Sequence, residues 1–194
     1  MAFGKHWEWR GFGRVSNDLR ARIESLDLLF APGQSLVDTY LWTPDGPANV
    51  KLRFGDLKFK RLLDSDGDFQ YWQEDENEIY PFPLDADVMS ALEQALAITL
   101  PGDQRLPVGR DELMEMLKSA VPPAQILYVE KVRRFFSLPA ADGEPVIVEL
   151  TDILRPERIG SVALEHTNIE AVRQALTQLR LTSSALRPLN YLRA

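Results

Sequence analysis

The chain has 194 residues, 45% of them hydrophobic and 26% charged, which is typical of a soluble globular protein with a sizeable core. It has no cysteine, which excludes disulfides and thiolate metal sites and favours a reducing, cytoplasmic compartment. The net charge of −7 argues against a general nucleic-acid or anionic-membrane surface. Residues 1–6 lack the apolar run of a signal peptide. The sequence contains no linker or repeat, so we expect a single domain over 1–194.

Residues 5–15 predict a first β-strand, because apolar and polar side chains alternate along them. The apolar face carries Trp7 and Trp9, and the polar face carries His6, Glu8 and Arg10. A face with two tryptophans must be covered, so this strand is expected to border a hydrophobic core.

A short helix and a second strand are predicted next. Ser16 can cap a helix that begins in residues 16–29. Residues 35–42 alternate again and predict a strand whose polar face carries Asp38 and Tyr40.

Residues 50–62 predict a β-hairpin, because two alternating runs meet at Gly55-Asp56 and glycine accepts a positive φ. Folding the chain at that turn pairs Phe54 with Leu57, Arg53 with Lys58, Leu52 with Phe59 and Lys51 with Lys60. Apolar side chains then share one face, and four cations share the other. Like charges directly across a strand pair are destabilising, so the cationic face is expected either to open to water or to bind an anion.

An acidic turn is predicted at residues 64–68, Asp-Ser-Asp-Gly-Asp, followed by a short strand over 69–73. A calcium loop is the alternative, but an EF-hand needs Gly at its sixth position and a bidentate Glu at its twelfth. Phe69 and Asp75 occupy those positions, so the tight turn is preferred.

Helices are predicted after Asp85 or Asp87, where Val88, Leu92 and Leu96 recur at helical spacing, and over residues 111–119. Strand periodicity returns from residue 125 and continues through two further runs, at 146–151 and 161–165. Thr167 to Glu170 reads as a capping box with Thr167 at the N-cap, which opens a last helix. His166, at this junction, is interpreted as structural.

The polar faces of these strands carry many more cations than carboxylates. The basic residues are Arg10, Lys51, Arg53, Lys58, Lys60, Lys131 and Arg133, and the acidic residues are Glu8, Glu149 and Glu165. This set has a charge of +4, which leaves −11 on the rest of the chain. If the apolar faces pack under the helices, the charged faces turn away from them, and a sheet that closes on itself would enclose the charges. We therefore predict an α+β fold with an antiparallel β-barrel and helices outside; the alternative is a flat sheet with one face in water.

A cationic lumen with a few carboxylates suits polyphosphate chemistry. Lys and Arg bind phosphoryl oxygens and neutralise charge that develops in phosphoryl transfer. Carboxylates hold Mg²⁺ or Mn²⁺, which polarise the phosphoryl group and position water.

In chain order, the polar strands resemble the motifs of the CYTH family, also called triphosphate tunnel enzymes. Glu8-Trp9-Arg10 resembles the end of the Glu-x-Glu-x-Lys signature, and Asp38-Thr39-Tyr40 resembles the Asp-x-Tyr strand. The family's basic strands are similar to Lys51-Leu52-Arg53 with Lys58 and Lys60, and to Lys131-Val132-Arg133. Its late acidic strands are similar to Val148-Glu149-Leu150 and Leu164-Glu165-His166. The resemblance implies an eight-stranded antiparallel tunnel with a phosphate site at the seven cations and a metal site at Glu8, Glu149 and Glu165.

The resemblance also implies a triphosphate-bearing ligand, either a polyphosphate or a nucleoside triphosphate, and Mg²⁺ or Mn²⁺ as the metal. Nucleic acid would bind only through a 5′-triphosphate end. Three positions depart from the motifs: His6 replaces the first signature Glu, Arg10 replaces the signature Lys, and Thr167 replaces the second late Glu. The cations remain while carboxylates are lost, so we expect anion binding with slow metal-dependent hydrolysis or none.

Two functional classes stay open. One is a phosphoanion site, in either a metal-dependent triphosphatase or a non-catalytic binder. The other is a structural or interaction protein on the same barrel, which fills its lumen with internal ion pairs and docks a basic partner on its acidic outer surface.

Overall fold

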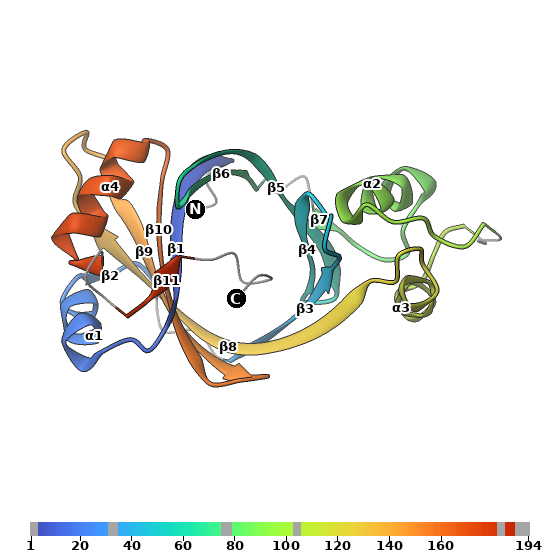
Figure 1. The fold of residues 1–194 in the computed structure, drawn as a ribbon, viewed down its shortest axis with the longest axis horizontal. Helices are drawn as coiled ribbons and strands as arrows, with labels where there is room; N and C mark the ends of the chain where they lie inside the picture. Colours follow the sequence, from blue (N-terminus) through green and yellow to red (C-terminus); the bar gives the residue numbers. More distant parts are fainter. Residues whose placement is uncertain (1–3, 31–34, 75–78, 103–105, 182–184, 189–194) are drawn as a thin grey trace. The chain divides into compact units, whose positions relative to one another are not determined.

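The computed structural model describes residues 4–30, 35–74, 79–102, 106–181 and 185–188 (Figure 1). By its internal contacts the chain divides into two compact units. Unit 1 comprises residues 1–4, 38–62 and 73–128, and unit 2 comprises residues 5–37, 63–72 and 129–194. Strands β3, β5, β6 and β8 contribute residues to both.

In the part of the chain that the structure describes, eight strands form the closed ring of one sheet. They are β1 (Lys5–Gly13), β3 (Leu36–Trp42), β4 (Ala48–Arg53), β5 (Asp56–Asp66), β6 (Phe69–Gln73), β8 (Gln125–Leu138), β9 (Val146–Arg155) and β10 (Ile159–His166). The hydrogen-bonded order is β10-β9-β8-β3-β4-β5-β6-β1, and β10 also pairs with β1. The ring of pairings therefore closes, which confirms the predicted antiparallel barrel and shows that the flat open sheet was wrong. Short strands β2 (Asp27–Leu28), β7 (Ile79–Tyr80) and β11 (Arg187–Pro188) pair with β8, β5 and β1.

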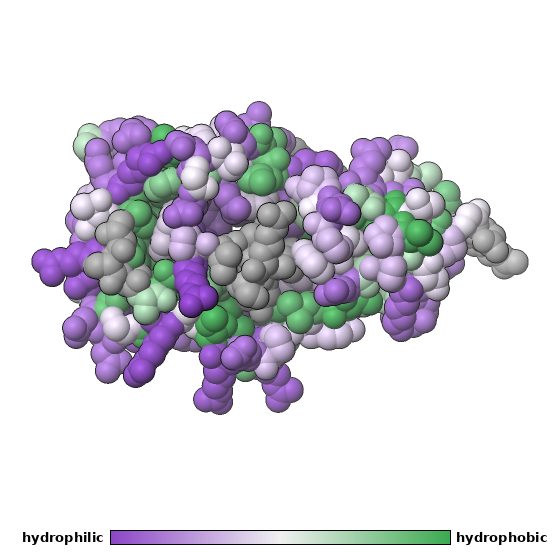
Figure 2. All heavy atoms as spheres, in the orientation of Figure 1, coloured by the Kyte–Doolittle hydropathy of each residue, from purple (hydrophilic) through white to green (hydrophobic). Residues whose placement is uncertain are grey.

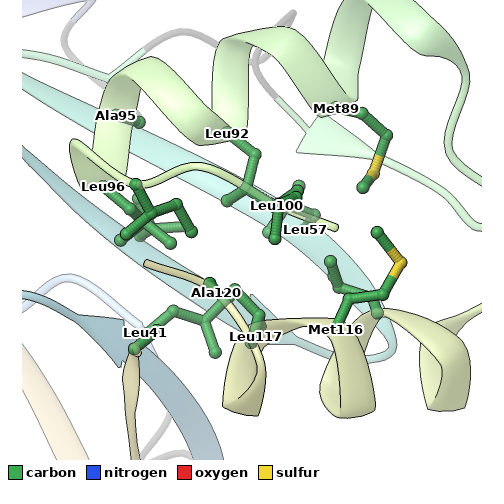
Figure 3. Packing of buried hydrophobic residues seen from close by; sticks show 14 of the residues in the cluster. Leu41, Leu57, Met89, Leu92, Ala95, Leu96, Leu100, Met116, Leu117 and Ala120 are labelled. Carbon is green, nitrogen blue, oxygen red and sulfur yellow. The ribbon is translucent and has the colours of Figure 1, made fainter. Parts of the chain in front are cut away.

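Unit 1 has its own hydrophobic core, formed by the apolar faces of β3 to β5 and two helices (Figure 3). Helix α2 (Ala86–Leu96) begins where Asp85 accepts a hydrogen bond from the Val88 amide at 3.0 Å. Of the two predicted N-cap candidates, Asp85 and not Asp87 is therefore the cap. Helix α3 (Arg110–Lys118) follows Gly109 and ends at Ser119. Leu92 and Leu117 are fully buried against the strands. Because the apolar faces are used here, the cations of β4 and β5 point to the opposite face of the sheet.

Unit 2 has a separate core, in which helices α1 (Asn17–Glu24) and α4 (Ile169–Gln178) cover the apolar faces of β1, β9 and β10. Trp9, Val148, Leu150, Leu164 and Val172 are its central buried residues. The two predicted faces of the first strand are confirmed, since Trp9 lies in this core while Glu8 contacts Arg10.

The last helix begins one residue later than predicted. Asn168, and not Thr167, is the N-cap of α4, and its side-chain oxygen accepts from the Glu170 amide at 2.9 Å. The capping box at Thr167 was therefore wrong. His166 explains the shift, because its Nδ1 accepts from the Asn168 amide at 2.9 Å and so holds the chain before the helix. The Nε2 of this fully buried ring lies 3.2 Å from the Glu144 carbonyl, which fits the structural role expected of His166.

The predicted hairpin forms, but its register was wrong by one residue at the turn. Strands β4 and β5 pair Arg53 with Asp56 and Lys51 with Lys58, so Phe54-Gly55 is the two-residue turn. Both turn residues have positive φ, 53° at Phe54 and 97° at Gly55, and Phe54 is 85% exposed. The turn therefore keeps Phe54 out of the core, where the prediction had placed it opposite Leu57. Each partner moves by two positions, so the four cations still share one face.

The acidic turn predicted at residues 64–68 is shorter in the structure, because β5 runs through Asp66 and only Gly67-Asp68 form the turn before β6 begins at Phe69. An ion pair joins Asp66 to Arg173 at 2.5 Å. On the face drawn in Figure 2, hydrophilic residues predominate and hydrophobic ones form small, scattered groups. None of the described helices is both long enough and apolar enough to cross a membrane.

The cap of α1 gives a first test of this account. Ser16 Oγ accepts a hydrogen bond from the Leu19 amide at 3.2 Å. Ser16→Ala is expected to lower the free energy of unfolding by about 1 kcal/mol, because an N-terminal amide of the helix loses its acceptor. Urea unfolding of the variant, beside Ser65→Ala on the exposed end of β5 as a control, measures this difference. Equal losses in both variants would contradict the capping role.

Candidate functional site

The predicted site residues fall into two groups, one in each unit, and each group is described by itself. Unit 1 holds Lys51, Arg53, Lys58 and Lys60 on β4 and β5. Unit 2 holds Arg10, Lys131, Arg133, Glu8, Glu149 and Glu165 on β1, β8, β9 and β10.

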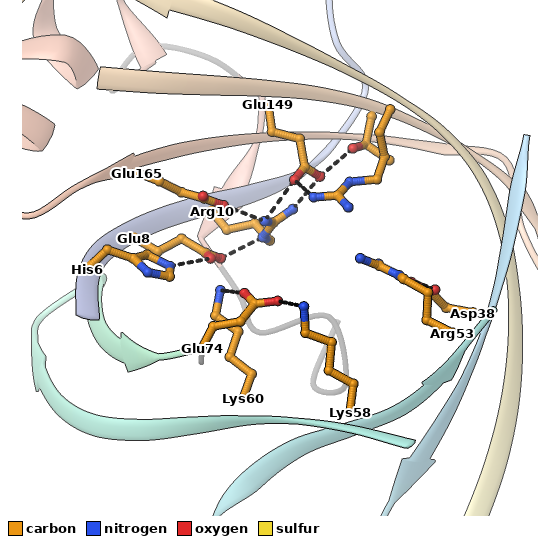
Figure 4. Close-up of polar contacts among 12 residues, drawn as sticks. His6, Glu8, Arg10, Asp38, Arg53, Lys58, Lys60, Glu74, Glu149 and Glu165 are labelled. Atoms are coloured by element: carbon orange, nitrogen blue, oxygen red, sulfur yellow. Dashed lines mark hydrogen bonds and ion pairs between the residues drawn. The ribbon is translucent and has the colours of Figure 1, made fainter. Parts of the chain in front are cut away.

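The lysines of unit 1 converge on a carboxylate that the sequence patterns did not single out. Glu74 follows β6, and one of its oxygens lies 2.8 Å from Lys58 Nζ while the other lies 3.7 Å from Lys60 Nζ (Figure 4). Burial raises the pKa of Glu74, but the charges of Lys60, Lys51 and Lys58 outweigh it and hold that pKa well below its usual range. The three ammonium groups thus act on a single anionic position, which Glu74 holds in this structure.

The cationic face of the hairpin is not open to water. Lys51 is 6% exposed and Lys60 is 8% exposed, although both lie on the face opposite the hydrophobic core. Lysine is rarely buried to this degree unless an anion is near its ammonium group. Of the two outcomes expected for these paired cations, the structure therefore favours an anion position.

Arg53 is held by a different carboxylate. Its Nε and one terminal nitrogen donate to the two oxygens of Asp38 at 2.7 and 2.6 Å, a bidentate geometry. Asp38 is fully buried, and the Tyr40 hydroxyl also lies 3.4 Å from it. The Asp-x-Tyr motif of β3 thus positions the Arg53 guanidinium of the basic strand β4.

The arginine of β1 lies among the three predicted acidic residues in unit 2 (Figure 4). Arg10 Nε lies 2.6 Å from Glu8, and its terminal nitrogens lie 3.0 Å from Glu149 and 3.5 Å from Glu165. Burial lowers the pKa of Arg10, but the charges of Glu149 and Glu8 outweigh it and raise that pKa well above its usual value. The guanidinium is therefore a permanent cation among the carboxylates of Glu8, Glu149 and Glu165.

Glu149 is shared by two arginines. Arg133 on β8 donates to one of its oxygens at 2.5 Å, and the Thr151 hydroxyl donates to the other at 2.6 Å. Burial raises the pKa of Glu149, but Arg10 and Arg133 hold it well below the usual range. Arg133 also stacks over the Phe135 ring at 4.6 Å, so its position is fixed from two sides. Lys131, on the same strand, is 8% exposed.

A second grouping in unit 2 includes a residue that the motif comparison treated as a departure. His6, Glu8 and Glu165 each offer a ligand atom, and these atoms lie within 4.8 Å of one another. The imidazole Nε2 is 4.0 Å from a Glu8 oxygen, and Glu8 lies directly across from Glu165 on β10. One imidazole and two carboxylates are a donor set that fits Mn²⁺ better than Mg²⁺. Glu149, predicted as the third metal ligand, lies outside this group and accepts from arginines instead.

Comparisons with known proteins agree with the fold. No family model and no curated protein sequence matches this chain. Among solved structures, the putative adenylyl cyclase HpAC1 from Hippeastrum, reported to have a dominant triphosphatase activity, has a TM-score of 0.51 at 15% identity, over 95% of this chain and 91% of that one. The PH1012 protein from Pyrococcus horikoshii has a TM-score of 0.49 at 16% identity, over 95% of this chain and 97% of that one. The closed ring of strand pairings and the likeness to HpAC1 together give this chain the tunnel fold that its motifs predicted.

Proposed function

We propose that this protein binds a triphosphate-bearing anion, a polyphosphate or a nucleoside triphosphate, through the lysines of unit 1. The observation that carries the proposal is the convergence of Lys51, Lys58 and Lys60 on one partly buried anionic position. Ammonium groups bind phosphoryl oxygens by charge-assisted hydrogen bonds, and burial strengthens them because water is excluded. The likeness of the fold to that of a protein with triphosphatase activity supports the same ligand class.

The seven predicted cations are not equivalent under this proposal. Arg53, Arg10 and Arg133 are each engaged by a carboxylate at 3.0 Å or less, so their guanidinium groups are already neutralised in part. Lys58 also lies 2.8 Å from a carboxylate, but three lysines share that one carboxylate, Glu74, so this group keeps an excess of positive charge and is the more suitable first contact. A 5′-triphosphate end of a nucleic acid would offer the same phosphates.

Thermal unfolding with tripolyphosphate, ATP and pyrophosphate tests this proposal. A ligand that binds only the folded protein raises its stability by mass action. We expect tripolyphosphate to raise the Tm, and Lys58→Ala to weaken its binding by roughly 1–3 kcal/mol, the scale of a charge-assisted contact. Lys118→Ala, on the exposed face of α3 in the same unit, is the matched control and should bind like the wild type. Equal binding by both variants would remove Lys58 from the site.

A catalytic role would require a divalent ion, and His6, Glu8 and Glu165 are the residues that would hold it. Such an ion would polarise a phosphoryl oxygen when bound. We expect phosphate release from tripolyphosphate to be slow at most and to be faster with Mn²⁺ than with Mg²⁺, because Mn²⁺ accepts imidazole more readily. Phosphate release with each metal, for wild type and Glu8→Gln, measures this. Rapid turnover in Mg²⁺ that survives Glu8→Gln would show that the metal site lies elsewhere.

The second candidate is the non-catalytic structural or interaction protein, and the internal ion pairs favour it. Arg53 with Asp38, and Arg10 and Arg133 with Glu149, are the internal pairs that such a barrel would use to fill its lumen. This function predicts no stabilisation by any of the three phosphoanions, so the same thermal experiment separates the two candidates.

A further inference from the structure

The carboxylates of unit 2 come from three different strands and meet at one guanidinium. Glu8 is on β1, Glu149 is on β9 and Glu165 is on β10. The nitrogen atoms of Arg10 lie 2.6, 3.0 and 3.5 Å from their oxygens. Two of these acids, Glu8 and Glu149, are almost fully buried, at 4% and 2% exposure.

The strand pairing makes a cation necessary at this place. Glu8 lies directly across from Glu165, and in the next row of that face Arg10 lies across from Ala163, which in turn lies across from Glu149. Like charges directly opposite each other destabilise a sheet, and a buried carboxylate without a partner costs more still. The small side chain of Ala163 leaves the row between Arg10 and Glu149 open, so the guanidinium can span it.

Arginine suits this position in a way that lysine does not. A guanidinium has five donors in a rigid planar fork, and here it reaches three carboxylates at once, with separate nitrogens for Glu8 and Glu149. A lysine ammonium is a compact point charge on a flexible stem, so it would satisfy fewer of these oxygens in one position.

We infer that Arg10 is the resident cation among the carboxylates of Glu8, Glu149 and Glu165 and takes the place of a divalent ion there. The native protein then binds divalent cations weakly in unit 2, and removal of the guanidinium creates a tight site. Two features support the inference. The Glu8 oxygen at 2.6 Å from Arg10 is already used by a charge-assisted hydrogen bond. A second cation bound by His6, Glu8 and Glu165 would also lie close to the positive guanidinium, in a buried place where repulsion is little screened.

This inference concerns the ligands of a metal and does not require that a phosphoanion binds in unit 1. If the anion binding proposed above fails, the cation balance of unit 2 is unaffected. If instead the native protein binds a divalent ion tightly, the inference fails while anion binding stands.

Binding of Mn²⁺ alone, followed by electron paramagnetic resonance and by thermal unfolding with and without EDTA, tests the inference. Wild type is expected to bind Mn²⁺ weakly and to keep its Tm in EDTA. Arg10→Gln is expected to lose stability in EDTA, to bind Mn²⁺ at least about tenfold more tightly than wild type, and to recover part of its Tm when Mn²⁺ is added. The double variant Arg10→Gln/Glu8→Gln should lose the gained binding, which places the ion at the carboxylate group.

Arg20→Gln is the matched control, because Arg20 is an arginine of the same unit whose partners, Asp152 and Glu24, are not among the three carboxylates around Arg10. It should bind Mn²⁺ as weakly as wild type. If Arg10→Gln does not fold even with Mn²⁺, Arg10→Lys decides the question. Lysine reaches fewer of the carboxylates, so the Arg10→Lys protein should bind Mn²⁺ more tightly than wild type. Equal Mn²⁺ affinity of wild type and the position-10 variant that folds, or tight binding by wild type, would overturn the inference.

Discussion

Glu149→Gln is expected to lower the free energy of unfolding by about 3–5 kcal/mol, which is the range for removing one partner of a buried ion pair. The carboxylate is 2% exposed and accepts from Arg10, Arg133 and Thr151. The amide of glutamine has one acceptor oxygen and no charge, so two arginines lose their shared anion. Urea unfolding at neutral pH, with fluorescence of the tryptophans as the signal, measures the loss.

The control for this prediction is Glu115→Gln, which removes a carboxylate from an exposed ion pair with Lys118 on α3. Exposed pairs contribute between zero and about 1 kcal/mol, so this variant should unfold close to the wild-type midpoint. A loss at Glu149 no larger than the loss at Glu115 would mean that the arginines of unit 2 find other partners.

Acid is expected to destabilise the protein by several kcal/mol, with the loss beginning as the pH falls through about 4.5. Glu74 and Glu149 both have their pKa held below the ordinary value of 4.5, by lysines at Glu74 and by arginines at Glu149. A carboxyl group whose pKa is lower in the folded state binds its proton less readily when folded than when unfolded. It therefore contributes its full stabilisation above the unfolded pKa, and this is lost as the pH falls toward the folded pKa.

The midpoint of urea unfolding, measured at intervals from about pH 7 to about pH 3, gives this pH dependence. Glu74→Gln should reduce the acid-induced loss, because one of the two carboxylates no longer titrates. The variant should be less stable than wild type at neutral pH and should approach it in acid. A pH dependence identical in the two proteins would contradict the role assigned to the lysines around Glu74.

Much of the barrel could be predicted because side-chain alternation records which face of a strand is apolar. The polar faces of β1, β4, β5 and β9 carry the residues expected of them, and Ser16 and Asp85 cap the helices that follow them. Periodicity does not record register. The turn falls at Phe54-Gly55 and not at the predicted Gly55-Asp56, and alternation could not distinguish them because both candidate turns contain the same glycine.

The missing part of the site is Glu74, and it is missing for a physical reason. In the sequence it opens an acidic run, Glu74 to Glu78, which is typical of a solvent-exposed turn. Glu74 differs from the rest of this run only in the folded chain, where the end of β6 lies beside the lysines of β5. The position of His6 beside Glu165 depends in the same way on pairing between strands that are more than 150 residues apart in sequence. Glu8, Glu149 and Glu165 were identified from alternation, but the side chains that each of them contacts were not.

The two-residue tip at Phe54-Gly55 also limits how this hairpin can change in evolution. The cations of β4 and β5 share a face only while the pairing keeps its parity, since neighbouring residues on a strand point to opposite sides. A length change of two residues at the exposed tip would leave Lys58 and Lys60 on the same side as Lys51. A change of one residue would exchange them for Leu57 and Phe59, or would require a bulge. Natural variation at this tip should therefore come in even steps.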